Sequence, residues 1–192
     1  MKKILIFIVI FFSSISNINA DDIKRIVVGN KNAKITIIAF ESLTCSHCAN
    51  FHKDVYPELK KEYLDTGLAK IEFRHFPLDI AAFNASKVSQ CKNDGDSKIL
   101  NILYAKQQKW IKGNSVEEAN KNLQKFLTNE GIDVDFETCI NNKEIEDFVL
   151  NDRIDGVKNF KVNATPTIII NNEKFEKSLN YKNLKKALEK LI

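Results

Sequence analysis

Two cysteines lie where a predicted strand turns into a predicted helix, and this stretch constrains the fold more than any other part of the chain. Residues 35–40 form an apolar run of the kind that makes a buried strand. Residues 46–64 carry apolar side chains at steps of three and four, the spacing of a core-facing helix. Cys45 and Cys48 therefore fall on one face at the start of that helix, within reach of a disulfide.

The start of a helix stabilises an anion, because free backbone N–H groups and the positive end of the helix dipole meet there. A Cys45 thiolate is such an anion, and His47 adds a donor that can become cationic near neutral pH. In Cys-x-x-Cys sites, thiol pKa values fall from about 8.5 to roughly 3.5–7.5. We therefore predict a redox-active dithiol–disulfide pair. Half of a zinc site and an inert structural bridge are the alternatives.

Residues 1–20 have the pattern of a secretory signal peptide. Lys2 and Lys3 form a basic start, residues 4–12 are an unbroken apolar run, and a more polar stretch ends in the small residue Ala20. Cleavage is predicted after Ala20. An uncleaved membrane anchor is the alternative, although the apolar run is short for a span of about 20 residues. Export makes an oxidising compartment available.

Charge gives no sign of a nucleic-acid partner. The 192-residue chain has 29 Lys and Arg against 25 Asp and Glu, and loss of Lys2 and Lys3 leaves 27 against 25, or +2. The basic residues are spread among acidic ones and form no stripe, so no nucleic-acid binding is expected. The length suits one domain, or one domain with an insertion.

Strand patterns occur at the two ends of the remaining chain, with helix patterns between them. Pro57 should kink the first helix, and Asn171-Asn172 is a candidate tight turn. Predicted strands cover residues 24–28, 35–40, 69–76, 167–170 and 173–177, and predicted helices cover residues 46–64, 80–93, 96–111, 115–130, 134–140, 143–160 and 181–191.

This order of elements predicts an α/β fold with a mixed sheet. The strand–helix–strand unit must have parallel strands and a right-handed crossover, whereas the final hairpin is antiparallel. Helices then flank a central sheet, which is interrupted by a helical insertion over residues 79–143. The sheet domain comprises residues 21–78 and 144–192.

Pro166 stands at the head of the predicted 167–170 strand, where a proline cannot donate to the ladder. A cis Thr165–Pro166 bond is one solution, and an ordinary trans proline at a strand start is the alternative.

The chain resembles the DsbA-like family of exported thiol–disulfide oxidoreductases, in the thioredoxin superfamily. The resemblance covers roughly residues 27–188 and implies a thioredoxin fold with an inserted helical domain, and a cis Pro166. Ser46 stands where the family commonly has Pro, and the residues between the cysteines help to set the redox potential. The segments that carry the resemblance are residues 29–33, 35–48, 51–52, 56–60, 66–67, 73–79 and 165–167.

The resemblance also implies roles for individual residues. Cys45 is the exposed nucleophile and the sulfur that substrate attacks, Cys48 is the buried resolving cysteine, and His47 tunes the Cys45 thiolate. Pro166 is similar to the cis-proline that faces the disulfide, and Thr165 contacts substrate through its backbone. No cofactor or metal is implied.

Cys91 and Cys139 fall in the helical block, where some similar proteins carry an extra disulfide. By that resemblance they form a structural bridge, closing a loop of about 48 residues worth roughly 4 kcal/mol on the disputed chain-entropy account. Buried free thiols, or a zinc site shared with Cys45 and Cys48, are the alternatives. Zinc ribbons normally pair two close Cys-x-x-Cys knuckles, which this chain lacks.

Three further titratable residues have weaker patterns. Glu41, at the end of the 35–40 strand, is a candidate for proton transfer to or from Cys48, and a rim carboxylate is the alternative. His52 and His75 are single histidines that we expect to be ordinary, partly buried residues.

These features together predict an exported, monomeric oxidase that introduces disulfide bonds into reduced exported proteins in the periplasm. A membrane-bound partner would reoxidise it. The alternatives are an isomerase or reductase on the same fold and, in another class, a metal-binding or chaperone module.

Overall fold

A single mixed sheet forms the centre of the protein. The computed structural model describes residues 23–192, so the predicted signal peptide and its alternative, an anchor, lie outside the described residues. The five strands have the order β1-β3-β2-β4-β5. β2 and β3 are parallel and β4 and β5 are antiparallel, as predicted, and the β1–β3 and β2–β4 pairs are also antiparallel. The strands are β1 (Ile26–Gly29), β2 (Ile35–Glu41), β3 (Ala69–His75), β4 (Thr167–Ile170) and β5 (Glu173–Lys174).

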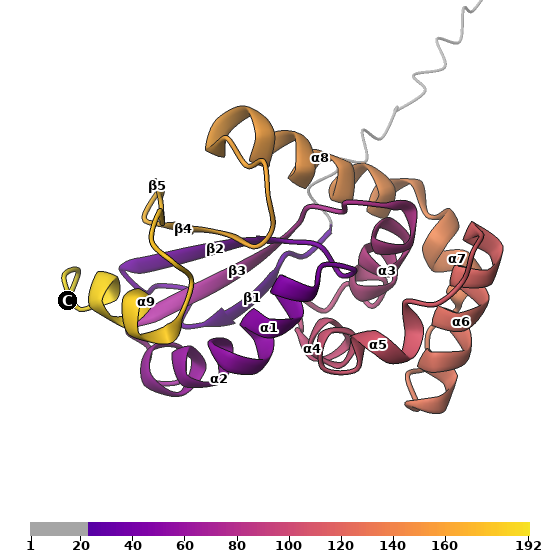
Figure 1. Ribbon diagram of the computed structural model, residues 1–192, viewed down its shortest axis with the longest axis horizontal. Coiled ribbons are helices and arrows are strands. Elements are labelled where there is room, and N and C mark those ends of the chain that lie inside the picture. Colours follow the sequence, from indigo (N-terminus) through magenta and orange to yellow (C-terminus); the bar gives the residue numbers. More distant parts are fainter. Residues whose placement is uncertain (1–22) are drawn as a thin grey trace, which may run out of the picture.

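Helices cover both faces of this sheet (Figure 1). One face carries α1 (Ser46–Asp54), α2 (Tyr56–Leu59), the π-helical turn η2 (Lys60–Leu64) and α9 (Tyr181–Leu188), and the other carries α8 (Lys143–Phe160). The arrangement confirms the predicted fold class. A helical block lies between β3 and α8 and consists of α3 (Ile80–Gln90), α4 (Lys98–Ala105), α5 (Gln107–Trp110), α6 (Val116–Asn129) and α7 (Phe136–Asn141).

The boundaries of the insertion, predicted at residues 79 and 143, stay a prediction. Helix α8 packs on both parts: Ile145 and Val149 near its start form a cluster with Phe83 of α3, and Gly156 near its end lies against the sheet residue Phe40. The described residues contain no helix long and apolar enough to cross a membrane.

Two of the predicted helices are interrupted within their length. The predicted 46–64 helix breaks at Val55 (φ −121°, ψ −48°), which confirms the kink expected from Pro57, because Pro57 lacks an N–H and its ring crowds the preceding turn. The predicted 96–111 helix is likewise divided at Lys106 (φ −120°, ψ 27°). Asn171 and Asn172 both have positive φ (47° and 71°), which fits a type I′ hairpin turn.

The last two predicted elements are shorter than expected. Strand β5 ends at Lys174 instead of 177, because the chain must turn to begin α9, which Asn180 caps by accepting a hydrogen bond from the Asn183 N–H. Helix α9 ends at Leu188, and the terminal Ile192 is exposed and has no core to join.

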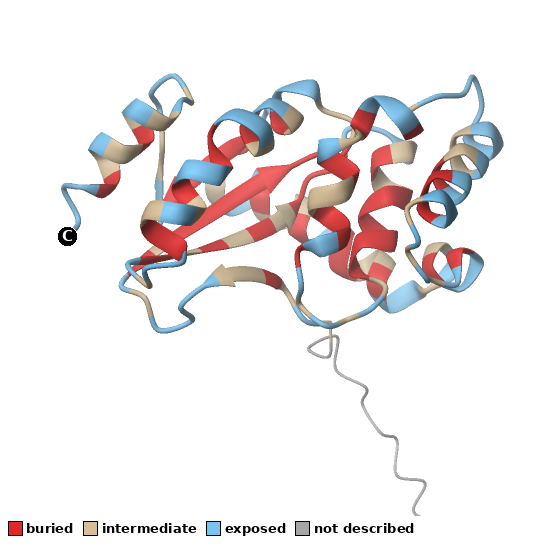
Figure 2. Cartoon of the chain, turned by 90° about the horizontal axis from the view of Figure 1, so that it is seen from below, coloured by how far each residue is buried: buried red, intermediate tan, exposed pale blue. Residues whose placement is uncertain are grey.

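The core has two layers because successive strand side chains point to opposite faces. Ile37 and Ala39 of β2 face α1, whereas Ile38 and Phe40 face α8. Figure 2 shows the buried residues concentrated on the strands and on the inner sides of the helices. Trp110 is also buried in the helical block and donates from Nε1 to the Leu103 carbonyl.

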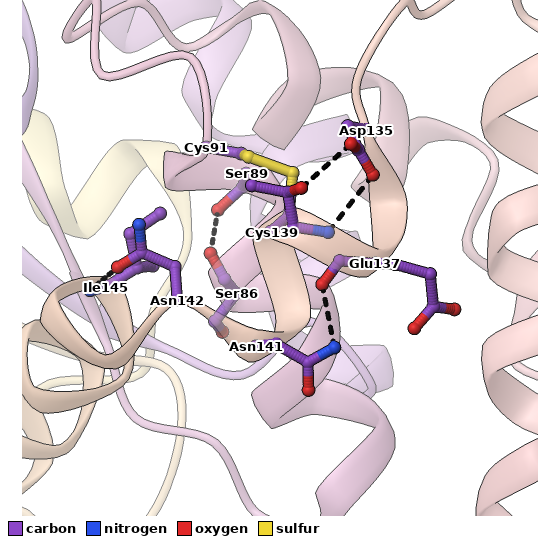
Figure 3. The surroundings of a disulfide bond; sticks show 10 residues. Ser86, Ser89, Cys91, Asp135, Glu137, Cys139, Asn141, Asn142 and Ile145 are labelled. Carbon is purple, nitrogen blue, oxygen red and sulfur yellow. Dashed lines mark hydrogen bonds between the residues drawn. A yellow bond between two sulfur atoms is a disulfide. The ribbon is translucent and has the colours of Figure 1, made fainter.

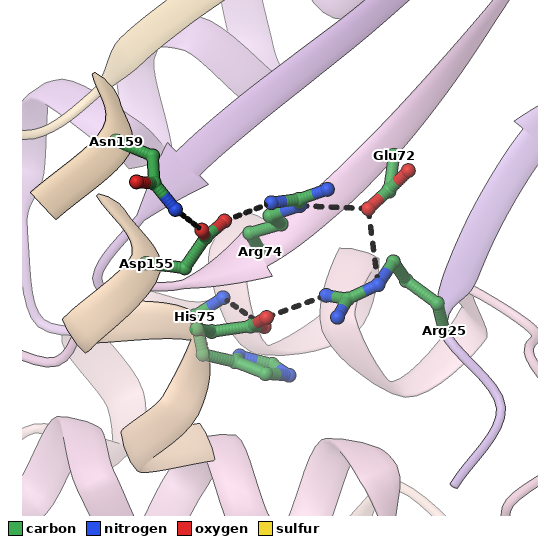
Figure 4. Close-up of polar contacts among 7 residues, drawn as sticks. Arg25, Glu72, Arg74, His75, Asp155 and Asn159 are labelled. Atoms are coloured by element: carbon green, nitrogen blue, oxygen red, sulfur yellow. Dashed lines mark hydrogen bonds and ion pairs between the residues drawn. The ribbon is translucent and has the colours of Figure 1, made fainter. Parts of the chain in front are cut away.

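Charged residues hold α8 against β3 and against the residue that precedes β1 (Figure 4). Asp152 accepts from Arg25 Nη1 at 2.6 Å and from the His75 backbone N–H at 3.0 Å. Arg25 and Arg74 both contact Glu72 Oε1, at 3.0 and 2.7 Å. Hydrogen bonds between charged groups are stronger than those between neutral groups. The network therefore fixes the position of α8 relative to the strands.

Gly156 lets α8 approach the sheet closely. A Cβ there would lie 2.9 Å from the Phe40 ring and 3.2 Å from the Phe76 ring, both buried. We expect Gly156→Ala to lower the free energy of unfolding by about 1–3 kcal/mol through overpacking, despite the better helix propensity of alanine. Urea unfolding measures it. The exposed Lys158→Ala on the same helix is the control, and an unfolding free energy equal to wild type for Gly156→Ala would contradict this packing.

A disulfide joins Cys91, just after α3, to Cys139 of α7 (Figure 3). These sulfurs are therefore not available to complete a zinc site with Cys45 and Cys48. The bridge lies within the helical block and ties its first helix to its last.

Candidate active site

Cys45 is the N-cap of α1, and its partly exposed sulfur lies where the helix begins. Both Cys45 and Cys48 are free thiols in this structure. A hydrogen bond from the Cys48 thiol, helped by the backbone N–H groups of Cys48 and His47, lowers the pKa of Cys45 to about 5 against the opposing effect of burial. Cys45 is therefore a thiolate near neutral pH.

Cys48 has the opposite character. It is fully buried, and burial, with further contributions from its hydrogen bond to Cys45 and the charge of Glu41, raises its pKa far above that of an ordinary thiol. The two sulfurs of the pair thus divide the roles of exposed thiolate and buried, protonated thiol.

The loop that precedes β4 lies against Cys45. The Thr165–Pro166 bond is cis, and the Cys45 Sγ lies 3.3 Å from the Thr165 carbonyl oxygen. Pro166 and Thr165 line a groove of about 500 Å³ together with His47 and Phe51 of α1 and Tyr181 of α9. Thr165 therefore connects the groove to the reactive sulfur.

A buried pair of titratable side chains lies on the same side of the sheet as the cysteines. The Glu41 Oε2 atom is 2.8 Å from His52 Nε2, and the two side chains are only 3% and 5% exposed. Burial raises the pKa of Glu41, and the bond to His52 opposes that rise. Glu41 is thus an interior carboxyl and not the rim carboxylate considered from the sequence.

A side chain of the helical block is hydrogen-bonded to the active-site loop. The buried Gln107 of α5 donates from Nε2 to the carbonyl oxygens of Leu43 and Cys45, both at 2.9 Å. These bonds hold the turn that presents Cys45. Among the described residues, no group of three or more His, Cys, Asp or Glu is arranged to hold a metal ion.

Comparison with known proteins supports the thioredoxin-like fold. A family model described as thioredoxin matches residues 21–190. The chain belongs to this family. Its thioredoxin-like architecture is shared with the crystal structure of α-DsbA1 from Wolbachia pipientis, at a TM-score of 0.76 and 29% identity over 87% of this chain and 90% of that one.

Curated relatives have names from disulfide chemistry. A protein of Rickettsia prowazekii named a protein-disulfide oxidoreductase is 29% identical over 89% of this chain. The Bacillus subtilis disulfide bond formation protein D is 27% identical over 85% of this chain and 75% of its own length. This thioredoxin-family chain spans about three-fifths of the length of the Rickettsia relative (62%).

The structure brings together most of the residues singled out from the sequence. Cys45, Cys48, Thr165 and Pro166 meet at the start of α1, and Glu41 lies on the same face of the sheet. The His47 side chain is exposed, and what it gives Cys45 here is its backbone N–H. Its tuning role as a side chain stays a prediction.

Sequence reasoning missed His52 and Gln107. His52 is not an ordinary histidine, because it pairs with the buried Glu41. Its spacing of four residues after Cys48 places both on one helix face and was the available signal. Nothing in the sequence pattern around Gln107 indicates its contact with the Cys45 loop.

The low pKa of Cys45, about 5, predicts an alkylation rate that reaches half its maximum near pH 5. Removing the main cause, in Cys48→Ala, should move that midpoint upward. Iodoacetamide labelling of reduced protein over a pH series, read by peptide mass, measures both. The urea-unfolded protein is the control and should titrate near pH 8.5, as an ordinary thiol does. The same midpoint in folded and unfolded protein would contradict this electrostatic account.

Proposed function

We propose that this chain is an exported thiol–disulfide oxidoreductase that introduces disulfide bonds into newly exported proteins. The observation that carries the proposal is the asymmetry of the pair: a partly exposed Cys45 whose pKa is lowered to about 5, beside a buried Cys48. A stabilised thiolate favours the reduced form, which makes the disulfide an oxidant.

The reaction begins from the Cys45–Cys48 disulfide. A substrate thiolate attacks the Cys45 sulfur, the bond between the two cysteines breaks, and Cys48 takes the electron pair and is then protonated. A second substrate thiolate attacks the substrate sulfur of the mixed disulfide. The substrate gains a disulfide, and the protein departs with Cys45 as thiolate and Cys48 as thiol.

The groove beside Pro166 suits an extended substrate chain. Its lining includes His47, Thr165 and Tyr181, and the carbonyl oxygen of Thr165 lies 3.3 Å from Cys45 Sγ. An extended segment here would place its own cysteine against Cys45 and its backbone against Thr165, the contact expected from the family resemblance. The substrates are therefore reduced, unfolded exported chains.

The cellular setting belongs to the same proposal. The signal-peptide pattern of residues 1–20 directs the chain to the periplasm, where it acts as a monomer without a cofactor. The reduced protein must then be reoxidised, and a membrane-bound partner with its own disulfide fits this requirement. Zinc or chaperone function is the rival class.

One assay separates these possibilities. Oxidised protein is mixed with a reduced, unfolded polypeptide that contains several cysteines, and substrate disulfides are counted by mass. Stoichiometric transfer of one disulfide per protein supports the proposal. Metal analysis of the same preparation is done in parallel, and bound zinc without disulfide transfer would favour the rival class.

A further inference from the structure

The buried thiol of Cys48 needs a proton donor and acceptor that the exposed side of the site does not supply. Each turnover breaks or makes the bond between Cys45 and Cys48, so a proton must reach or leave the Cys48 sulfur. Cys48 is a residue of α1, and its sulfur is fully buried in the core between this helix and the sheet. The Glu41 carboxyl is the group whose charge acts on it from the sheet side.

We propose that His52 is a positioning residue for this proton exchange: it holds the Glu41 carboxyl by one oxygen and leaves the other free to take and return the proton of Cys48. The inference rests on the proposed function and assigns a role to a residue outside the Cys-x-x-Cys motif.

The hydrogen-bonding of the pair supports this division. Glu41 Oε2 is bonded to His52 Nε2 at 2.8 Å, whereas Glu41 Oε1 is buried and has no hydrogen-bond partner among the described residues. An unpaired carboxylate oxygen in the interior is costly. Glu41 lies on the same face of the sheet as the buried Cys48 thiol and its charge acts on that thiol, so this oxygen is suited to accept the proton.

Aromatic rings fix the orientation of His52. The Tyr104 ring of α4 stacks on it at a centroid distance of 4.1 Å and an interplanar angle of 17°, and the Phe73 ring of β3 lies at 5.3 Å and 29°. His52 Nδ1 is buried and, among the residues described, has no partner. The His52 ring is therefore held by stacking and by its hydrogen bond to Glu41.

Loss of His52 would change the charge state of Glu41. Burial alone raises the pKa of this carboxyl, and His52 opposes that effect. Without the bond, both carboxyl oxygens would be buried and unpaired, so the pKa of the carboxyl would rise further. The protonated form, which cannot accept a proton from Cys48, would then be favoured.

The remaining titratable groups near the pair do not replace it. Besides Cys45 and Cys48 at the start of α1, these groups are Tyr56 of α2, Tyr104 of α4 and His75, the β3 residue opposite Glu41. Burial raises the pKa of Tyr56 and Tyr104 and lowers the pKa of His75 to about 3, so all three side chains are neutral near pH 7.

His52 also lies beside a groove that is separate from the one proposed to hold substrate, so a proton can pass to solvent on that side. His52, Lys53 and Tyr104 line a groove of about 820 Å³ between α1–α2 and α4–α5. The Pro166 groove uses His47, Phe51 and other α1 residues, and Asn50 lines both. Substrate in the Pro166 groove would thus leave the His52 side open to solvent.

The step is balanced in both directions. When substrate thiolate attacks Cys45, the Cys45–Cys48 bond breaks, Cys48 leaves as thiolate, and the protonated Glu41 carboxyl gives it a proton. In the reverse direction, Cys48 gives its proton to the Glu41 carboxylate. The Cys48 thiolate then attacks the Cys45 sulfur of a mixed disulfide and expels the partner thiolate. His52 stays bonded to Glu41 and gains or loses no electrons.

The test follows the two steps of oxidation by oxidised glutathione separately. Reduced protein is mixed with the reagent, quenched with acid and analysed by mass, which distinguishes the glutathione adduct on Cys45 from the closed Cys45–Cys48 disulfide. In His52→Phe, adduct formation should match wild type. Closure should slow at least about tenfold at neutral pH, below the 10²–10⁴-fold typical of losing an acid–base group. Its rate should keep rising to higher pH than in wild type.

Matched variants separate this role from packing. His52→Gln retains an N–H donor for Glu41 and should restore part of the rate, whereas His75→Phe makes the same change at a buried histidine without a bond to Glu41 and should have no effect. In a Glu41→Gln background, His52→Phe should add no further loss, because His52 acts through Glu41. This comparison holds even if one single variant is less stable.

Two results would overturn the inference: wild-type closure rate and pH profile in His52→Phe, or equal slowing by His75→Phe. Failure of wild-type protein to form the Cys45 adduct would instead overturn the proposed function, so the two failures are distinguishable.

Discussion

Replacing Cys45 with serine is expected to abolish disulfide transfer to a reduced substrate, to the rate of the buffer alone. The thiolate at the start of α1 is the sulfur that substrate attacks in the proposed mechanism, and a hydroxyl cannot form the disulfide that is transferred. The measurement is the stoichiometric assay described above. Transfer at the wild-type rate by Cys45→Ser would rule out the mechanism.

Cys48→Ser is the matched control for that experiment. It keeps Cys45 but has no second sulfur, so Cys45 should attack oxidised glutathione, release one glutathione as thiolate and keep the other in a mixed disulfide that persists. Accumulation of this species in Cys48→Ser, together with its absence in Cys45→Ser, would assign the nucleophile to the sulfur at the helix start and the resolving role to the buried one.

Removal of the second disulfide is expected to give the largest loss of stability. The Cys91–Cys139 bridge links residues 48 apart in sequence, and a closed loop of that length is worth about 4 kcal/mol on the chain-entropy account. We expect the double variant Cys91→Ala/Cys139→Ala to lose about 2–5 kcal/mol of unfolding free energy, measured by urea unfolding of the oxidised protein.

The alkylation profile of Cys45 provides the control for this prediction. It should be unchanged, because the bridge lies within the helical block and contributes nothing to the hydrogen bonds of Cys45. A loss below about 1 kcal/mol would show that the bridge does not restrain the unfolded chain as this account requires.

The sequence predicted the parts of the site that depend on local order. A strand, a turn with Cys45 and Cys48 and a helix are consecutive in the chain, so helix-start chemistry follows from spacing alone. Period-two and period-three-to-four patterns likewise placed β2, β3, α8 and β4 within a residue or two.

What the sequence could not predict depends on contacts between distant segments. The bond between Glu41 and His52 requires α1 to lie over the end of β2, and the stacking of Tyr104 requires α4 to close the other side. Gln107 reaches the Cys45 loop from 62 residues away. Such contacts are set by how the helical block packs, and no periodicity records that packing.

The redox potential of the Cys45–Cys48 couple tests the central claim most directly. The protein is equilibrated in glutathione buffers of known ratio, trapped with acid, and the fraction of the Cys45–Cys48 disulfide is measured by peptide mass. The account predicts an oxidising couple, at about −120 to −180 mV. A potential at or below roughly −230 mV would contradict it and identify a reductant.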